Sequence, residues 1–121
     1  MARAKKHSTT KDPVFAAIEK HRIAMTEYYK ALKPLARNNG EPDPRKEKKY
    51  GEREIRAIDR LTSTAPTTLQ GLLALVTYIN GVSNGEFSSG KHDNSFDESE
   101  SLYSVLANAE KVLAEQIGRA A

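Results

Sequence analysis

Apolar residues recur at steps of three and four along much of the chain, which is the spacing of amphipathic helices. The first such segment follows Asp12-Pro13, a favourable N-cap and first helical position. We expect this helix to reach about Leu35 unless Pro34 ends it early, and Asn38-Asn39-Gly40 predicts the stop behind it. Its apolar seam consists of Val14, Ile18, His21, Met25, Tyr28, Leu32 and Leu35.

Three further helices are predicted downstream. The second spans from about Asp43 or Arg45 to Leu61, and its apolar positions are Ile55, Ile58 and Leu61. The third starts with Pro66 in its first turn and ends at Asn80-Gly81. Because it is apolar over most of its circumference, we expect it to be the central helix.

The last helix is expected to begin near Ser95, because Ser95 and Glu98 have the spacing of a capping box. Its apolar stripe consists of Leu102, Val105, Leu106, Ala109, Val112, Leu113 and Ile117. The stretch before it, residues 81–95, is rich in Gly, Ser and Asn and predicts a flexible loop.

Together these segments predict an all-α fold, a small antiparallel bundle of three to four helices. A chain of 121 residues suits one domain, which we place at residues 12–121. Residues 1–11 hold four Lys or Arg and little to bury, so a disordered basic tail is expected there. A bundle of this size buries a limited core, and self-association would add to its stability.

Charge and composition narrow the picture further. Residues 1–62 hold 16 Lys and Arg against 9 Asp and Glu, a net charge of +7, whereas residues 63–121 hold 3 against 7, a net −4. Opposed halves of this kind favour contacts within the fold, between copies or with charged partners. The chain has no cysteine, no apolar run long enough for a membrane span and no apolar segment after the basic start. We therefore expect a cytoplasmic protein without membrane attachment.

Two groups of residues resemble a family of small uncharacterised helical proteins from alphaproteobacteria. The first group is Asp12-Pro13-Val14-Phe15, Ile18-Glu19 and His21-Arg22, and the second is Thr64, Pro66-Thr67-Thr68-Leu69, Gly71-Leu72, Ala74-Leu75 and Tyr78. Leu106-Ala107 is a weaker match, and Gln70 and Thr77 depart from the pattern. The resemblance covers about half of the chain. It implies a helical, bacterial and cytoplasmic protein, and it implies no activity.

The most unusual polar position is His21, which falls on the apolar seam of the first helix. One interpretation is a polar site for a small ligand or a metal ion, formed by Glu19, His21, Arg22, Thr67 and Thr68. The other is structural: His21 is a hydrogen-bonded core residue, and the threonines cap a helix. Because Glu19 and His21 are two residues apart, they point in different directions and do not form a helical metal pair.

A second candidate surface is basic. Phosphate contacts require cations along one face, and a mobile basic arm would add reach. The candidate nucleic-acid contacts are Arg3, Lys5, Lys6, Arg45, Lys46, Lys48, Lys49, Arg53, Arg56 and Arg60. Four acidic residues lie among them, and Tyr50 is the nearby aromatic residue for base stacking. A solvated helix face of mixed charge explains the same pattern.

No arrangement of nucleophile, base and acid typical of an enzyme is evident, so we expect no catalytic residues, no metal and no cofactor. The leading hypothesis is a non-enzymatic helical interaction module that binds a protein partner or a second copy through its first or last helix. An accessory nucleic-acid-binding protein is the alternative, and a ligand-binding bundle around His21 is the third.

Overall fold

The computed structural model describes residues 12–120 and consists of α-helices and loops. The helices are α2 (Pro13–Ala31), α3 (Pro44–Ser63), α4 (Leu69–Ser83) and α5 (Ser99–Ala120), with a short 3₁₀ helix, η1 (Ala36–Asn38). Over the described residues there is no strand, only an isolated bridge between Leu35 and Glu41. The predicted all-α class is confirmed. The predicted tail, residues 1–11, lies outside the described residues.

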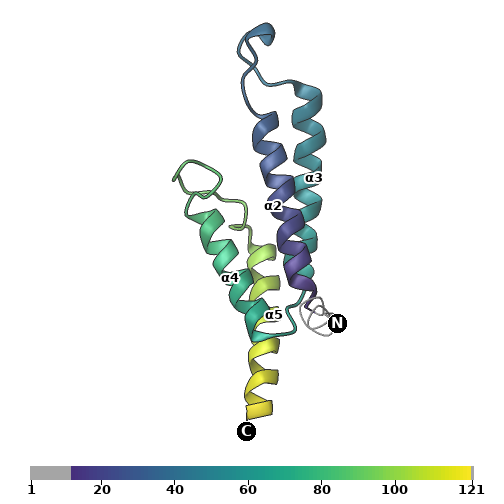
Figure 1. Cartoon of the computed structure of the whole chain (residues 1–121), viewed down its shortest axis with the longest axis vertical. Coiled ribbons are helices and arrows are strands. Elements are labelled where there is room, and N and C mark those ends of the chain that lie inside the picture. The colour runs from purple at the N-terminus through teal and green to yellow at the C-terminus, as the bar shows by residue number, and fades with distance from the viewer. Residues whose placement is uncertain (1–11, 121) are drawn as a thin grey trace, which may run out of the picture.

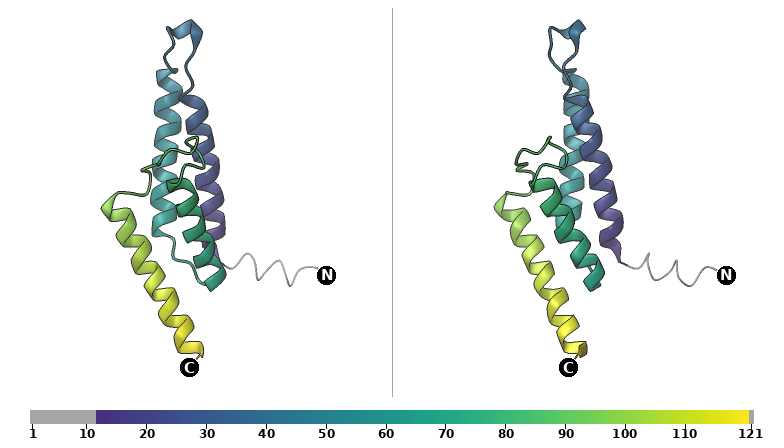
Figure 2. Two further views of the ribbon diagram at one scale, coloured as in Figure 1. Left: turned by 90° about the vertical axis from the view of Figure 1, so that its left-hand side faces the viewer. Right: turned by 60° about the vertical axis from the view of Figure 1, so that its left-hand side comes forward.

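The four helices form two antiparallel hairpins that pack side by side (Figure 1). Helix α2 contacts α3 and α4, and α5 contacts α3 and α4, so the order around the bundle is α2, α3, α5, α4. The α2–α3 hairpin extends beyond α4 at one end of the molecule, and the last turns of α5 extend beyond it at the other (Figure 2). The result is a long bundle whose four helices lie together only over its middle.

Asp12 starts α2 and also joins it to α4. Its Oδ1 accepts the Val14 N–H at 3.2 Å, as the predicted N-cap should. Its Oδ2 accepts the Thr68 N–H at 3.1 Å and the Thr68 hydroxyl at 2.5 Å. The Thr68 hydroxyl oxygen in turn accepts the Gly71 N–H and caps α4. The predicted start of this helix at Pro66 is therefore wrong, because Thr68 supplies the cap.

The other helix ends agree with the predicted capping residues and prolines in some places and differ from them in others. Helix α2 ends at Ala31, short of Pro34, and α3 begins at Pro44 with Asp43 as its N-cap. Helix α4 continues past Asn80-Gly81 to Ser83. Helix α5 begins at Ser99 rather than Ser95, because Ser95 is engaged elsewhere: its N–H and hydroxyl both donate to Asp93.

Side chains from all four helices and from the segment before α5 form the core. Its members are Val14, Ala17, Ile18, Met25, Ile58, Leu61, Leu75, Tyr78, Val82, Phe96 and Val105. Phe96, in the segment before α5, is buried, whereas Tyr103 on α5 is exposed. Phe96 therefore anchors the loop that leads into α5.

Several predicted core positions are instead on the surface. Ile55 is exposed, as are Leu69, Leu73 and Val76 on α4. Helix α4 is thus not the central helix that its apolar composition predicted, because it covers α2 and α5 with one side only. On α5, Val105 and Val112 are buried while Leu102, Leu106, Leu113 and Ile117 remain exposed.

The close approach of α2 and α4 makes Gly71 a sensitive position. A Cβ atom added at Gly71 would lie 1.9 Å from Asp12 Oδ2. We predict that Gly71→Ala destabilises the fold by roughly 1–3 kcal/mol, because the Asp12 carboxylate must leave its partners. Chemical denaturation measures this change.

Gly118→Ala is the matched control, since its Cβ would meet nothing within 4 Å in the same kind of helical backbone. It should raise stability by roughly 0.5–1 kcal/mol. Equal effects of the two substitutions would contradict the contact between Asp12 and Thr68.

Candidate functional site

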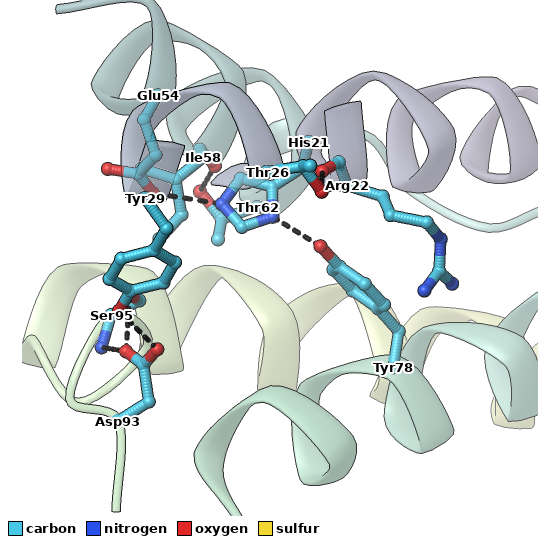
Figure 3. Close-up of polar contacts among 10 residues, drawn as sticks. All are labelled: His21, Arg22, Thr26, Tyr29, Glu54, Ile58, Thr62, Tyr78, Asp93 and Ser95. Carbon is cyan, nitrogen blue, oxygen red and sulfur yellow. Dashed lines mark hydrogen bonds and ion pairs between the residues drawn. The ribbon is translucent and has the colours of Figure 1, made fainter. Parts of the chain in front are cut away.

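His21 lies at the centre of the bundle and bridges three helices (Figure 3). Its side chain is completely buried. Nδ1 lies 2.6 Å from the Tyr78 hydroxyl of α4, and Nε2 lies 2.9 Å from Glu54 Oε2 of α3. A neutral imidazole protonated at Nε2 satisfies both partners, since it donates to the carboxylate and accepts from the phenol.

Aromatic rings enclose this imidazole. The rings of Tyr78 and Phe96 have centroids 5.6 Å and 5.4 Å from that of His21. Burial raises the pKa of the Tyr78 hydroxyl above its ordinary value, although the Arg22 guanidinium, 4.9 Å from the ring centroid, opposes the shift. Within residues 12–120, every buried side-chain nitrogen or oxygen has a hydrogen-bond partner. His21 therefore has no unused atom to offer a ligand.

The remaining residues of the predicted polar site do not gather around His21. Arg22 pairs with Glu86 at 3.0 Å and lies 3.6 Å from Glu19, and all three are substantially exposed. Thr67 is exposed, and Thr68 caps α4 at the Asp12 contact. The structure brings Glu54 and Tyr78 to His21 instead. Sequence spacing could not identify them because they come from other helices.

A second polar cluster fixes the loop between α4 and α5. The Tyr29 hydroxyl donates to Asp93 Oδ2 at 2.9 Å, and Asp93 is buried (Figure 3). Partial burial of Tyr29 and its bond to Asp93 raise the pKa of the phenol to about 12. His92, the neighbour of Asp93, instead lies 2.7 Å from Asp97, and this bond raises its pKa. The predicted flexible stretch is thus attached to α2 by this contact and by the Arg22–Glu86 pair.

No set of three or more His, Asp or Glu side chains that could hold a metal ion occurs in the described part of the chain. No helix between residues 12 and 120 is long and apolar enough to cross a membrane. The described surface nevertheless carries two extended features, one basic and one apolar.

The basic feature lies on α3. Lys46, Lys49, Arg53, Arg56 and Arg60 are exposed and follow one another at steps of three and four residues, so they share one side of the helix. We call these five residues the basic row. Arg45 borders it, whereas Lys48 lies across the helix in a hollow with Tyr28 and Ile55. Arg3, Lys5 and Lys6, the other predicted contacts, are outside the described residues.

The apolar feature spans α4 and α5. We call it the apolar face, and it consists of Leu69, Leu73, Val76, Leu102, Leu106, Leu113 and Ile117, which are 41–68% exposed.

The α4 residues and the α5 residues of the apolar face lie on the same outer surface of the bundle, as the neighbouring contacts of each helix indicate. Asn108 donates to the Thr62 carbonyl of α3, and the α5 leucines lie beyond Val105 and Val112 on the opposite side, next to α4. On α4, Gln70 and Ala74 border a groove shared with α2. By the turn of the helix, Leu69 and Val76 lie on the side next to α5.

The groove between α2 and α4 extends this apolar surface. Its volume is about 740 Å³, and Phe15, Ile18 and Leu73 line it, with the Arg22–Glu86 ion pair at one end. Since Leu73 borders both, the groove and the apolar face are continuous around α4.

Comparisons with known proteins give no match, so a proposal about function must rest on the structural features described above. No protein-family model matches the sequence, and neither a curated protein nor a solved structure matches it.

We predict that His21→Leu destabilises the protein by roughly 2–3 kcal/mol, because the Tyr78 hydroxyl and the Glu54 carboxylate lose their buried partner. Tyr78→Phe removes one of those two groups. A double-mutant cycle of His21→Leu and Tyr78→Phe, measured by urea denaturation, should give a coupling of about 1 kcal/mol. A coupling near zero would mean that the contact between these two side chains adds no stability.

The raised pKa of Tyr29 makes stability fall at high pH. The phenol ionises near pH 10 in the unfolded chain and near 12 in the folded one, so the unfolded state loses its proton first. The contribution of Tyr29 is complete below pH 10 and is lost as the pH rises from 10 to 12. Tyr29→Phe should flatten the denaturation free energy against pH across this window. An unchanged slope would show that Asp93 does not hold the phenol in solution.

Proposed function

We propose that this protein is a non-enzymatic helical module that self-associates through the apolar face of α4 and α5. The observation that carries the proposal is the size of that face. Its seven aliphatic side chains together expose on the order of 700 Å², against roughly 800 Å² buried by each partner in a standard protein interface. A face of this size exceeds the largest apolar patch of most monomers, about 300–600 Å².

The charge of the face favours an apolar partner. Helix α4 contains no charged residue. On α5, Glu100, Lys111, Glu115 and Arg119 lie on other sides of the helix, whereas the exposed Glu110 borders the leucine row, four residues after Leu106 and three before Leu113. A similar surface could therefore cover the face as long as the Glu110 carboxylate stays in solvent at the rim of the interface.

The spacing along α5 favours a second copy of the chain. If two α5 helices pair antiparallel about a two-fold axis beside Ala109, Leu106 meets Leu113 of the other copy and Leu102 meets Ile117. The pattern is therefore complementary to itself, as an isologous interface requires. Ala109 is small, so the helices can approach closely at the axis.

The first test is the mass in solution. We predict that the full chain is a dimer by light scattering and that Leu106→Glu shifts it to a monomer, because two buried glutamates would face apolar side chains. Ile23→Glu is the matched control, since Ile23 is a half-exposed aliphatic residue of α2 outside the apolar face. A monomeric wild-type chain would contradict the proposal, and so would equal effects of both substitutions.

Cysteine cross-linking tests the antiparallel arrangement, since the chain has no cysteine of its own. Oxidised Ala109→Cys should give a covalent dimer because the two thiols meet at the axis. Leu102→Cys should not, since antiparallel pairing separates its two copies by roughly 22 Å. Cross-linking of both variants would indicate parallel helices, and cross-linking of neither would exclude α5 as the contact.

A further inference from the structure

The basic row of α3 is a surface that self-association leaves unexplained. Its five cations span residues 46–60, which is roughly 21 Å along a helix. Lys20 of α2 extends it sideways, because Lys20, Arg56 and Arg60 line the same open hollow between the two helices. The row therefore presents positive charge along a rigid element rather than along a loop.

Two of the four acidic residues of α3 are directed away from the row, and the other two border it. Glu54 is turned inward and holds His21, and Glu47 is partly buried. Glu52 and Asp59 lie at the edge of the exposed side, with Asp59 in the same hollow as Arg56. Glu27 of α2 approaches Arg53 only to 3.9 Å. The helix thus removes two of the four carboxylates from the row, and its five cations outnumber the acidic residues that border it, so the strip has a net positive charge.

Neighbouring groups indicate which polyanion the row suits. Tyr50 is the aromatic residue beside it, and its ring already faces Lys49 and Arg53 at 5.4 Å and 5.3 Å. Stacking of unpaired bases would have to displace these cations. A membrane surface would require an apolar side of α3 to insert, but Ile58 and Leu61 are buried in the bundle and the exposed Ile55 lies alone on another side of the helix. The regularly spaced phosphates on the outside of a duplex require neither a free aromatic ring for stacking nor an apolar helix side for insertion.

We propose that the basic row binds the phosphate backbone of double-stranded nucleic acid without reading its sequence. The binding is electrostatic and releases counterions from the duplex. It does not depend on self-association, because the row lies on the exposed side of α3, whereas the apolar face lies on α4 and α5.

The experiment measures binding of the full chain to a mixed-sequence duplex by fluorescence anisotropy over a range of salt concentrations. With about five phosphate contacts, the logarithm of the affinity should fall against the logarithm of salt with a slope of about −4 to −5. The variant Lys49→Gln/Arg56→Gln should bind more weakly, with a slope shallower by about 2. Both side chains are exposed, so the fold should be unaffected.

Lys91→Gln/Arg119→Gln is the matched control. It removes one lysine and one arginine from exposed positions outside α3 and should leave the slope unchanged. No binding at low salt would overturn the proposal. An equal loss in both variants would also overturn it, as would an unchanged slope in the α3 variant, which would assign binding to other cations such as those of residues 1–11. Binding to anionic lipid vesicles without binding to the duplex would overturn it in favour of a membrane surface.

Discussion

The bundle depends on a single buried imidazole. His21 is in the middle of α2, and each of its ring nitrogens is bonded to a different helix, Glu54 of α3 and Tyr78 of α4. These directional contacts fix the rotation of α2 against both neighbours, which apolar packing alone specifies less strictly. Phe96 packs against the same ring and brings the start of α5 to this point. The position that resembled a ligand site is therefore the junction of the fold.

Two further polar contacts also fix the position of α2 relative to the rest of the bundle. Asp12 joins the first turns of α2 and α4, and Asp93 attaches the loop before α5 to Tyr29 of α2. All three contacts involve α2, which packs closely against α3 and α4. The buried polar groups of the described residues thus serve to position helices, and the outer surfaces are left for binding.

Those outer surfaces differ because the helices differ in how much they bury. Helix α3 buries only a narrow strip around Ile58 and Leu61, so its cations remain in water. Helices α4 and α5 have more apolar side chains than their neighbours can cover, so leucines remain exposed. In a dimer formed through the apolar face, each copy would keep its basic row in solvent. Both proposed interactions can therefore occur in one assembly.

The sequence by itself determined the helices and several of their ends. The spacing of apolar residues, the Asp12 and Asp43 caps and the prolines are local signals, and local hydrogen bonding and sterics act in the same way in any tertiary context. These signals failed at Thr68, which is held by Asp12 from a distant part of the chain, and at Ser95, whose N–H and hydroxyl donate to the nearby Asp93 instead of capping α5. Periodicity also indicated that Leu102, Leu106 and Leu113 belong to an apolar stripe, but it could not say whether a stripe is covered.

Only the tertiary structure decided which polar residues meet. His21 is 33 residues from Glu54 and 57 from Tyr78, and no local pattern links positions on three helices. The helical conformation of residues 45–60 also places five of their cations in one basic row, because side chains three or four residues apart share a face. Burial and side-chain partners follow from how helices pack, and this packing is set by the whole chain rather than by any one segment.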